Sequence, residues 1–315
     1  MLQYFKYHIP FKKPFIVSGN EITYREGIIL HFREGNIEAY GEVAPLPGFS
    51  TETLAEVEEV LKVNKKHLQQ SIQDGNGKEV LKVLNQTHQF PSLSFGLDTL
   101  LHDLAAKRTR TSLVQYLFPS FSGSILTNAT IPIQNKMETL AAAKKYIDAG
   151  FQTLKLKVGR DFSVESKIIK QLRTQFPRIK IRIDANEAWT KKEAIQNLKA
   201  LEALNIEYCE QPVSRENLSD LKEVKEAVKI PVAADEFIRN INDVNKIIEK
   251  KATNLLIIKP MLMGTFNNIF VTKEVADTHN IELIFTTLFE TAVGRAAIAA
   301  ITAGLCGEYR AQGLA

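Results

Sequence analysis

Short apolar runs rich in β-branched residues alternate with segments of helical periodicity over most of the chain after residue 122. The runs have the length of strands, and the segments between them repeat apolar residues every three or four positions, as amphipathic helices do. The runs are 128–133, 153–159, 180–186, 206–212, 231–236, 254–260 and 282–288, and the helical segments are 137–149, 162–175, 190–204, 217–228, 241–250, 265–279 and 291–303. This alternation predicts an α/β fold, a modified (β/α)7β barrel of the TIM type.

The chain before this alternation has a different pattern. Strand-like segments at 27–33 and 37–42 are joined by Glu34-Gly35-Asn36, which is a hairpin signal. Helical patterns follow at 51–70, 77–84 and 94–107. We therefore predict two domains, an N-terminal α+β capping domain over 1–122 and a barrel domain over 123–315.

The run at 153–159 carries two lysines on one face. Because successive side chains of a strand point to opposite faces, Lys155 and Lys157 share one face and the apolar residues around them share the other. Inside a barrel, the two ammonium groups would lower each other's pKa by repulsion and desolvation, which makes a lysine a base. A Lys-x-Lys pair also arises by chance in a chain with 40 lysines and arginines.

Four further charged residues follow Lys157 at regular steps of 27, 26, 25 and 24 residues. They are Asp184, Glu210, Asp235 and Lys259, and each lies at the C-terminal end of a predicted strand. Functional groups of parallel barrels gather at these strand ends. We therefore expect the charged groups to meet on one rim.

The composition narrows the classes of partner. The chain has 315 residues, 44% hydrophobic and 24% charged, with a formal charge of +4 and no basic tract, so we expect no nucleic-acid partner. The N-terminus lacks the apolar core of a signal peptide and no apolar run is long enough to span a bilayer, so we expect a cytoplasmic protein with no membrane partner. Two cysteines, Cys209 and Cys306, are too few for a disulfide framework. Whether the chain is a monomer or a homo-oligomer stays open.

The charged residues suggest one kind of chemistry. Three carboxylates from adjacent strands form an all-oxygen site for a hard divalent cation, Mg2+ or alternatively Mn2+, that a small-molecule carboxylate substrate can approach. Such a cation acidifies the proton on the carbon next to the substrate carboxylate, because it stabilises the charge that develops when the proton leaves. A lysine is then the base.

This arrangement of residues resembles the enolase superfamily, in its muconate-lactonizing subgroup, over nearly the whole chain. Within the subgroup, several segments are similar to those of o-succinylbenzoate synthases. The similar segments are Gly41-Glu42-x-Ala44-Pro45-Leu46-Pro47-Gly48, Ser94-x-Gly96-Leu97, Asp184-Ala185-Asn186-x-x-Trp189 and Lys259-Pro260-x-x-x-Gly264.

The resemblance implies a role for each charged residue. Asp184, Glu210 and Asp235 would bind Mg2+, Lys157 would be the acid and base, and Lys155 and Lys259 would be its electrostatic partners. It implies a lyase, o-succinylbenzoate synthase, which dehydrates a succinyl-hydroxycyclohexadiene carboxylate in menaquinone biosynthesis.

The resemblance also implies residues that contact the substrate. Loops of the cap around Ser18 and Phe49 would close over it, and Thr286 and Thr287 would line the pocket at the end of the seventh strand. The family often has Ser-Ser-x-x-Glu at that strand end, whereas this chain has Phe289 before the glutamate, which would reshape the pocket.

Other functions stay open from the sequence. A racemase of N-acylamino acids or an epimerase of dipeptides, from the same subgroup, needs lysines on both faces of its substrate. A catalytically inactive barrel is a third alternative, but the charged residues that catalysis needs are all present, which argues against it. Dipeptide epimerases carry an Asp-x-Asp clamp in the eighth-strand region. Here that strand must come from 306–315 or from residues after Ala315, where we expect the chain to be truncated.

Overall fold

The computed structural model describes residues 1–17, 20–77, 79–80, 90–306 and 310–315. It divides into two compact units. The first unit comprises Met1–Ile125, Lys259–Lys273 and Phe285–Gly307, and the second comprises Leu126–Ile258, Glu274–Ile284 and Glu308–Ala315. The domain boundary at 122/123 stays a prediction.

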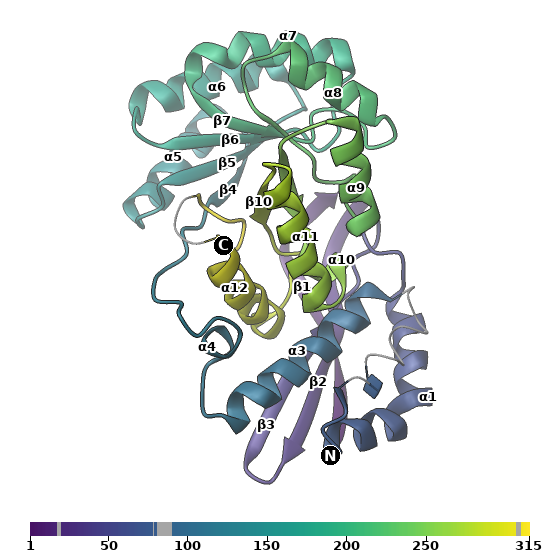
Figure 1. The fold of residues 1–315 in the computed structure, drawn as a ribbon. Coiled ribbons are helices and arrows are strands. Elements are labelled where there is room, and N and C mark those ends of the chain that lie inside the picture. Colours follow the sequence, from purple (N-terminus) through teal and green to yellow (C-terminus); the bar gives the residue numbers. More distant parts are fainter. Residues whose placement is uncertain (18–19, 78, 81–89, 307–309) are drawn as a thin grey trace. The chain divides into compact units, whose positions relative to one another are not determined.

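The first unit contains a three-stranded antiparallel sheet in the order β1-β2-β3 (Figure 1). The strands are β1 (Leu2–Val17), β2 (Asn20–Glu34) and β3 (Ile37–Val43), and Gly35, with φ 57°, makes the predicted turn between the last two. The sequence analysis did not predict β1. The helices of the first unit are α1 (Leu54–Gln73), α3 (Pro91–Arg108), α4 (Leu113–Leu117), α10 (Pro260–Met263) and α12 (Ala292–Cys306). Helix α11 (Phe266–Thr278) begins in this unit.

The core of the first unit forms between the sheet and its helices. Alternate residues of β2 are fully buried, as expected for a sheet that is covered on one face. Buried side chains in this cluster include Ile28, Leu30, Phe32, Val57, Leu61, Leu97 and Leu100. Residue 78 and residues 81–84 of the helix predicted at 77–84 lie outside the described part of the chain.

Two glycines bring α3 against β3. A Cβ on Gly41 would collide with the carbonyl oxygen of Gly96, and one on Gly96 would lie 2.8 Å from the carbonyl oxygen of Glu42. Both positions therefore require glycine because two backbones pack there without side chains between them. This contact explains why the sequence carries glycine in the two cap motifs.

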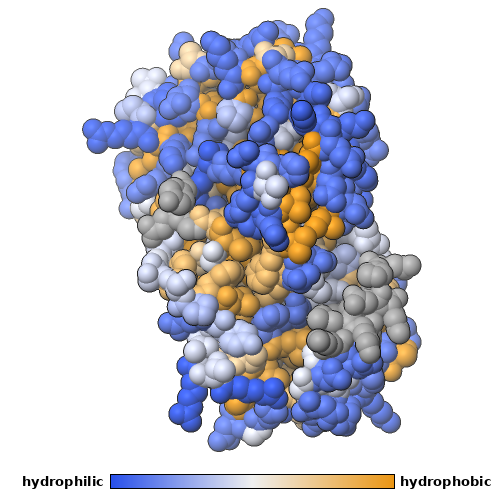
Figure 2. Space-filling view, in the orientation of Figure 1, coloured by the Kyte–Doolittle hydropathy of each residue, from blue (hydrophilic) through white to orange (hydrophobic). Residues whose placement is uncertain are grey.

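The second unit contains a parallel sheet in the order β4-β5-β6-β7-β8. The strands are β4 (Ala129–Pro132), β5 (Thr153–Lys157), β6 (Lys180–Asp184), β7 (Ile206–Glu210) and β8 (Val232–Ala233). The helices between and after them are α5 (Lys136–Asp148), α6 (Phe162–Gln175), α7 (Lys191–Leu201), α8 (Leu218–Ala227) and α9 (Ile241–Lys250). On the face seen in Figure 2, the helices around α7 and α8 present mostly hydrophilic residues.

Both edges of this parallel sheet continue. A bridge between Ala234 and Leu256 connects it to β9 (Leu255–Ile258), which pairs with β10 (Glu282–Phe285). At the other edge Gln312 forms an isolated parallel bridge with Thr127, within the segment that the sequence analysis considered for the eighth strand. The predicted fold class is confirmed. Among the described residues, no helix combines the length and the apolar character needed to cross a bilayer.

Candidate active site

The register of the second unit aligns the predicted residues at its strand ends. Lys157 on β5 pairs with Asp184 on β6, and Asp184 pairs with Glu210 on β7. Asp235 follows β8 by two residues, and its backbone N–H donates to the side-chain oxygen of Gln211 at 2.8 Å. The three carboxylates are almost completely buried, with exposed fractions of 0%, 2% and 4%.

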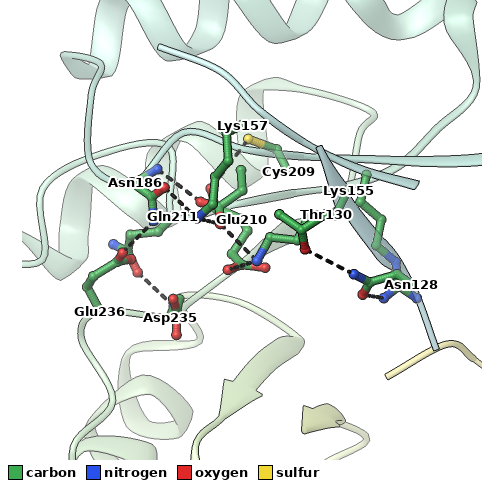
Figure 3. A network of polar contacts seen from close by, with 12 residues as sticks. Asn128, Thr130, Lys155, Lys157, Asn186, Cys209, Glu210, Gln211, Asp235 and Glu236 are labelled. Atoms are coloured by element: carbon green, nitrogen blue, oxygen red, sulfur yellow. Dashed lines mark hydrogen bonds and ion pairs between the residues drawn. The ribbon is translucent and has the colours of Figure 1, made fainter. Parts of the chain in front are cut away.

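The two lysines of β5 contact two of these carboxylates, Asp184 and Glu210, directly (Figure 3). The Nζ of Lys155 lies 2.8 Å from Oδ2 of Asp184 and 2.5 Å from Oε1 of Glu210. The Nζ of Lys157 lies 2.6 Å from the same Oδ2 and donates to Oδ1 of Asn186, also at 2.6 Å. The structure therefore brings together four of the predicted residues in one ion-pair network.

The electrostatics of Lys155 differ from the prediction. Burial would lower the pKa of its ammonium group, but the carboxylates of Asp184 and Glu210 outweigh burial and raise that pKa. The predicted depression of the Lys155 pKa is therefore wrong. The prediction considered burial and repulsion by Lys157, but the ammonium group of Lys155 also contacts two carboxylates. Lys155 is a fixed positive charge in this arrangement.

The pKa values of the carboxyl groups of Asp184 and Glu210 shift in opposite directions. Burial favours the neutral form of Asp184, yet Lys155 and Lys157 together hold its pKa well below the usual range. Burial and the neighbouring charge of Asp184 raise the pKa of Glu210. Asp184 is thus the carboxylate that stays ionised at the centre of the network.

The residues fit a divalent cation by their chemistry. Hard cations such as Mg2+ prefer carboxylate oxygens, and Asp184, Glu210 and Asp235 supply them from neighbouring strands. The adjacent Glu236 adds a buried Oε2 that has no hydrogen-bond partner, which is a further oxygen atom that a cation could bind. As the side chains stand, no group of three acidic, histidine or cysteine residues within the described ranges is arranged to hold a metal ion. Two of the carboxylates contact lysine ammonium groups instead.

Sequence reasoning missed two polar residues beside these strand ends. Asn186 joins Lys157 to Glu236, because its Nδ2 donates to Oε1 of Glu236 at 2.8 Å. Burial and the charge of Asp184 raise the pKa of Glu236 to about 7. Asn186 has a left-handed φ of 44°, a costly conformation that is common at functional sites. The signals available were the Asp-Ala-Asn and Asp-Glu sequences that follow the strands.

Lys259 belongs to the first unit, where it precedes α10. Its Nζ lies 4.8 Å from the ring centroid of Phe49, another predicted site residue. Thr286 and Thr287 are half-buried in the same unit. Their assignment to substrate binding, like that of Phe49, stays a prediction.

Phe289 also lies in the first unit and is exposed. It has a left-handed φ of 61°, and its ring meets that of Phe11 edge to face at 5.4 Å between centroids. Its predicted contact with substrate is not tested by these observations. Ser18 lies outside the described residues.

A buried arginine that the sequence analysis did not single out organises these loops. Arg25 donates hydrogen bonds to the backbone carbonyls of Ala44, Pro45 and Leu288, and is itself only 3% exposed. It therefore ties the loop that carries Phe49 to the segment that carries Phe289. A lone arginine in a strand gives no sequence signal for such a role.

Two family models match the chain. Residues 138–312 match the enolase C-terminal domain-like family, and residues 1–104 match the N-terminal domain of MenC. A hydrophobic dipeptide epimerase from Enterococcus faecalis is 27% identical over 308 residues, which cover 96% of this chain and 86% of the relative. An L-Ala-D/L-Glu epimerase from Bacillus subtilis is 30% identical over 212 residues, 66% of this chain and 58% of the relative.

Solved structures agree with these relatives. The crystal structure of the dipeptide epimerase from Enterococcus faecalis complexed with Mg and the dipeptide L-Leu-L-Tyr is 26% identical, with a TM-score of 0.87, and the match covers 99% of this chain and 88% of that one.

These names overturn the predicted lyase. The curated relatives named above are epimerases, which are isomerases and not lyases. The prediction of o-succinylbenzoate synthase as a carbon–oxygen lyase is therefore wrong. The predicted superfamily, in contrast, is confirmed. Since more than half of the chain matches the enolase C-terminal domain-like family, the protein belongs to the enolase superfamily.

Proposed function

We propose that this protein is a divalent-metal-dependent epimerase that inverts the stereocentre next to the carboxylate of a dipeptide. The names of the relatives support this class of reaction. The observation that carries it is Lys157, whose side chain is 26% exposed while its ammonium group contacts the fully buried Asp184. A partly accessible lysine, fixed beside a buried carboxylate, suits proton transfer to and from a bound substrate.

The metal would be Mg2+, as in the related epimerase structure. We assign its binding to Asp184, Glu210 and Asp235, whose carboxylates have the hard oxygen atoms that it prefers. When bound, it would supply the positive charge that stabilises the substrate carboxylate as negative charge develops there.

The side chains of this chain would move the protons. In one direction Lys157 removes the α-proton, and a second acid returns a proton to the opposite face of the same carbon; the resemblance noted from the sequence makes Lys259 the candidate for this acid. In the other direction the two groups exchange roles, so atoms and charge balance. Lys155 lies between Asp184 and Glu210, with its Nζ at 2.8 and 2.5 Å from their oxygen atoms, and would orient both carboxylates without transferring a proton.

The test is α-proton exchange in D2O, followed by NMR, with L-Leu-L-Tyr and L-Ala-L-Glu as dipeptides and Mg2+ present. We expect deuterium at the α-carbon of the C-terminal residue together with the second diastereomer. Lys157→Ala should abolish epimerisation, whereas Lys180→Ala, an exposed lysine on the neighbouring strand, should leave it unchanged.

An N-succinyl amino acid in the same assay distinguishes a racemase of acylated amino acids from a dipeptide epimerase. Exchange of that compound alone would refute the dipeptide assignment. Exchange of none of the three compounds would refute the epimerase class.

A further inference from the structure

The ammonium group of Lys157 contacts an amide as well as a carboxylate, and all three residues lie in the second unit. Among the described residues, its Nζ has two acceptors, Oδ2 of Asp184 and Oδ1 of Asn186, both at 2.6 Å (Figure 3). The Asp184 oxygen also contacts the Nζ of Lys155 at 2.8 Å, and we assign this carboxylate to the cation. Within the described ranges, the Asn186 oxygen is the acceptor that Lys157 alone uses.

The orientation of the Asn186 amide follows from its two neighbours. A lysine ammonium group has only donors, so the amide must turn its oxygen toward Lys157 and its Nδ2 away from it. The Nδ2 then donates to Oε1 of Glu236 at 2.8 Å, and Glu236 is only 2% exposed. A rotation of the amide by half a turn would lose both hydrogen bonds. The position of the Asn186 oxygen is therefore fixed from two sides.

The backbone that carries Asn186 is held as well. The Glu187 N–H donates to the Gln211 carbonyl at 2.9 Å, which ties the turn to the end of β7. The Asn186 N–H donates to Oδ1 of Asp184 at 3.0 Å. Asn186 has a left-handed φ of 44°, a conformation that asparagine adopts more readily than most residues other than glycine. The turn therefore fixes the point from which the amide side chain extends.

An amide acceptor suits a lysine that gains and loses a proton. The ion pair with Asp184 is strong only while the lysine is charged. A neutral amine still has two N–H groups, and an amide oxygen accepts a hydrogen bond from either form of the side chain. With one N–H bound to Asn186 and one to Asp184, a single position of Nζ remains for the proton that is transferred, or for the lone pair that receives it.

We infer that Asn186 is a positioning residue for Lys157: its amide oxygen holds Nζ so that this remaining position faces the substrate in both protonation states. This inference rests on the proposed function, in which Lys157 transfers the α-proton. The Lys157 side chain is 26% exposed, so the position that is left can be reached from outside. The contact with Asn186 thus adds direction to a lysine that Asp184 by itself would hold mainly by charge.

The experiment removes the side chain of Asn186 in two ways, in the Mg-loaded enzyme with L-Leu-L-Tyr and L-Ala-L-Glu as substrates. Asn186→Ala removes the amide and strains the left-handed backbone, whereas Asn186→Gly removes the amide but suits that backbone. Both should lower kcat for epimerisation by about 10- to 100-fold with little change in KM, as expected when a catalytic group loses its position. Full activity in Asn186→Gly would show that asparagine serves only the backbone, and would overturn the proposal.

The matched control is Asn205→Gly, because Asn205 also has a left-handed φ, 49°, and is exposed at the C-cap of the short helix η1 (Glu202–Leu204). This variant should leave kcat unchanged. The rise in melting temperature that Mg2+ causes should be the same in Asn186→Gly as in the wild type, because the backbone N–H that donates to Asp184 is kept. A lost response to Mg2+, or a change in KM alone, would overturn the proposal.

A second measurement is independent of turnover. The rate at which an amine-reactive reagent acylates Lys157, read by tandem mass spectrometry of peptides, should rise several-fold in Asn186→Gly, because Nζ loses one of its acceptors. Lys155, whose Nζ contacts two carboxylates, should react at the wild-type rate. Unchanged labelling of Lys157 would refute the role of Asn186. An inactive wild-type enzyme would refute the proposed function, while the labelling result would still decide whether Asn186 positions Lys157.

Discussion

At the scale of single residues, Glu290 is a carboxyl group buried among other charged and polar groups. It is 5% exposed, the Leu288 N–H donates to its Oε2 at 2.6 Å, and Arg25 and Glu42 act on it from β2 and β3. Burial is the main cause that raises its pKa to about 7, against the lowering effect of Arg25. The neutral form is therefore the one that the fold favours.

This pKa predicts a fall in stability as the pH rises. Between pH 4.5 and 7 the unfolded chain has lost the Glu290 proton and the folded chain keeps it, so the folded state loses up to about 3 kcal/mol relative to the unfolded one across this window. Urea unfolding at pH 5 and pH 8 should show that Glu290→Gln, which keeps the acceptor oxygen, is more stabilising at pH 8. An equal effect of the substitution at both pH values would contradict the prediction.

At the scale of elements, α12 is capped by a side chain from a distant strand. The buried carboxylate of Glu42 on β3 accepts hydrogen bonds from the backbone N–H groups of Thr291 and Gly294, both at 2.8 Å, and from Tyr7 Oη at 2.6 Å. A carboxylate at a helix N-terminus satisfies free N–H groups and interacts favourably with the helix dipole. Gly294 must be small, because a Cβ there would lie 2.8 Å from Glu290.

Glu42→Ala should therefore destabilise the protein by about 3 kcal/mol or more, since it leaves several buried donors without an acceptor. The matched control is Glu56→Ala, which removes the carboxylate from the exposed capping box of α1 and should destabilise the protein much less. Urea denaturation measures both. Similar losses in the two variants would show that the buried cap does not tie α12 to β3 as we expect.

At the scale of the whole molecule, metal binding should be linked to global stability. A ligand that binds only the folded chain stabilises it by about 2.7 kcal/mol at 100 times its dissociation constant. In the absence of metal, Lys155 neutralises the buried carboxylates Asp184 and Glu210. Lys155→Met removes that charge, so the carboxylates then repel each other with less compensation.

We therefore expect Lys155→Met to depend on Mg2+ more than the wild type does. The difference in melting temperature between Mg2+ and a chelator should be larger in this variant than in the wild type. Lys180→Met, on the same sheet but half exposed, should show the wild-type difference. A Lys155→Met protein that is insensitive to Mg2+ would argue against metal binding by these carboxylates.

The sequence by itself determined the alternating pattern and the groups at the strand ends. Both follow from local periodicity: a strand fixes which side chains share a face, and parallel strands align their C-terminal ends, so Lys155, Lys157, Asp184 and Glu210 could be predicted to meet. The strand β1 escaped prediction because its sequence contains Pro10 and Pro14 and exposes apolar residues, as edge strands can.

The sequence did not determine the reaction. Proton removal next to a carboxylate begins both a dehydration and an epimerisation, and the same lysines and carboxylates serve either, so the strand-end groups alone could not distinguish a lyase from an isomerase.

Only the tertiary structure decided which distant residues meet. The cation–π pair of Phe49 and Lys259 joins positions that no periodicity relates, and so does the contact of Glu42 with Thr291. Tertiary packing also reversed the predicted pKa of Lys155, because the effect of burial on a charge depends on the opposite charges that are buried with it.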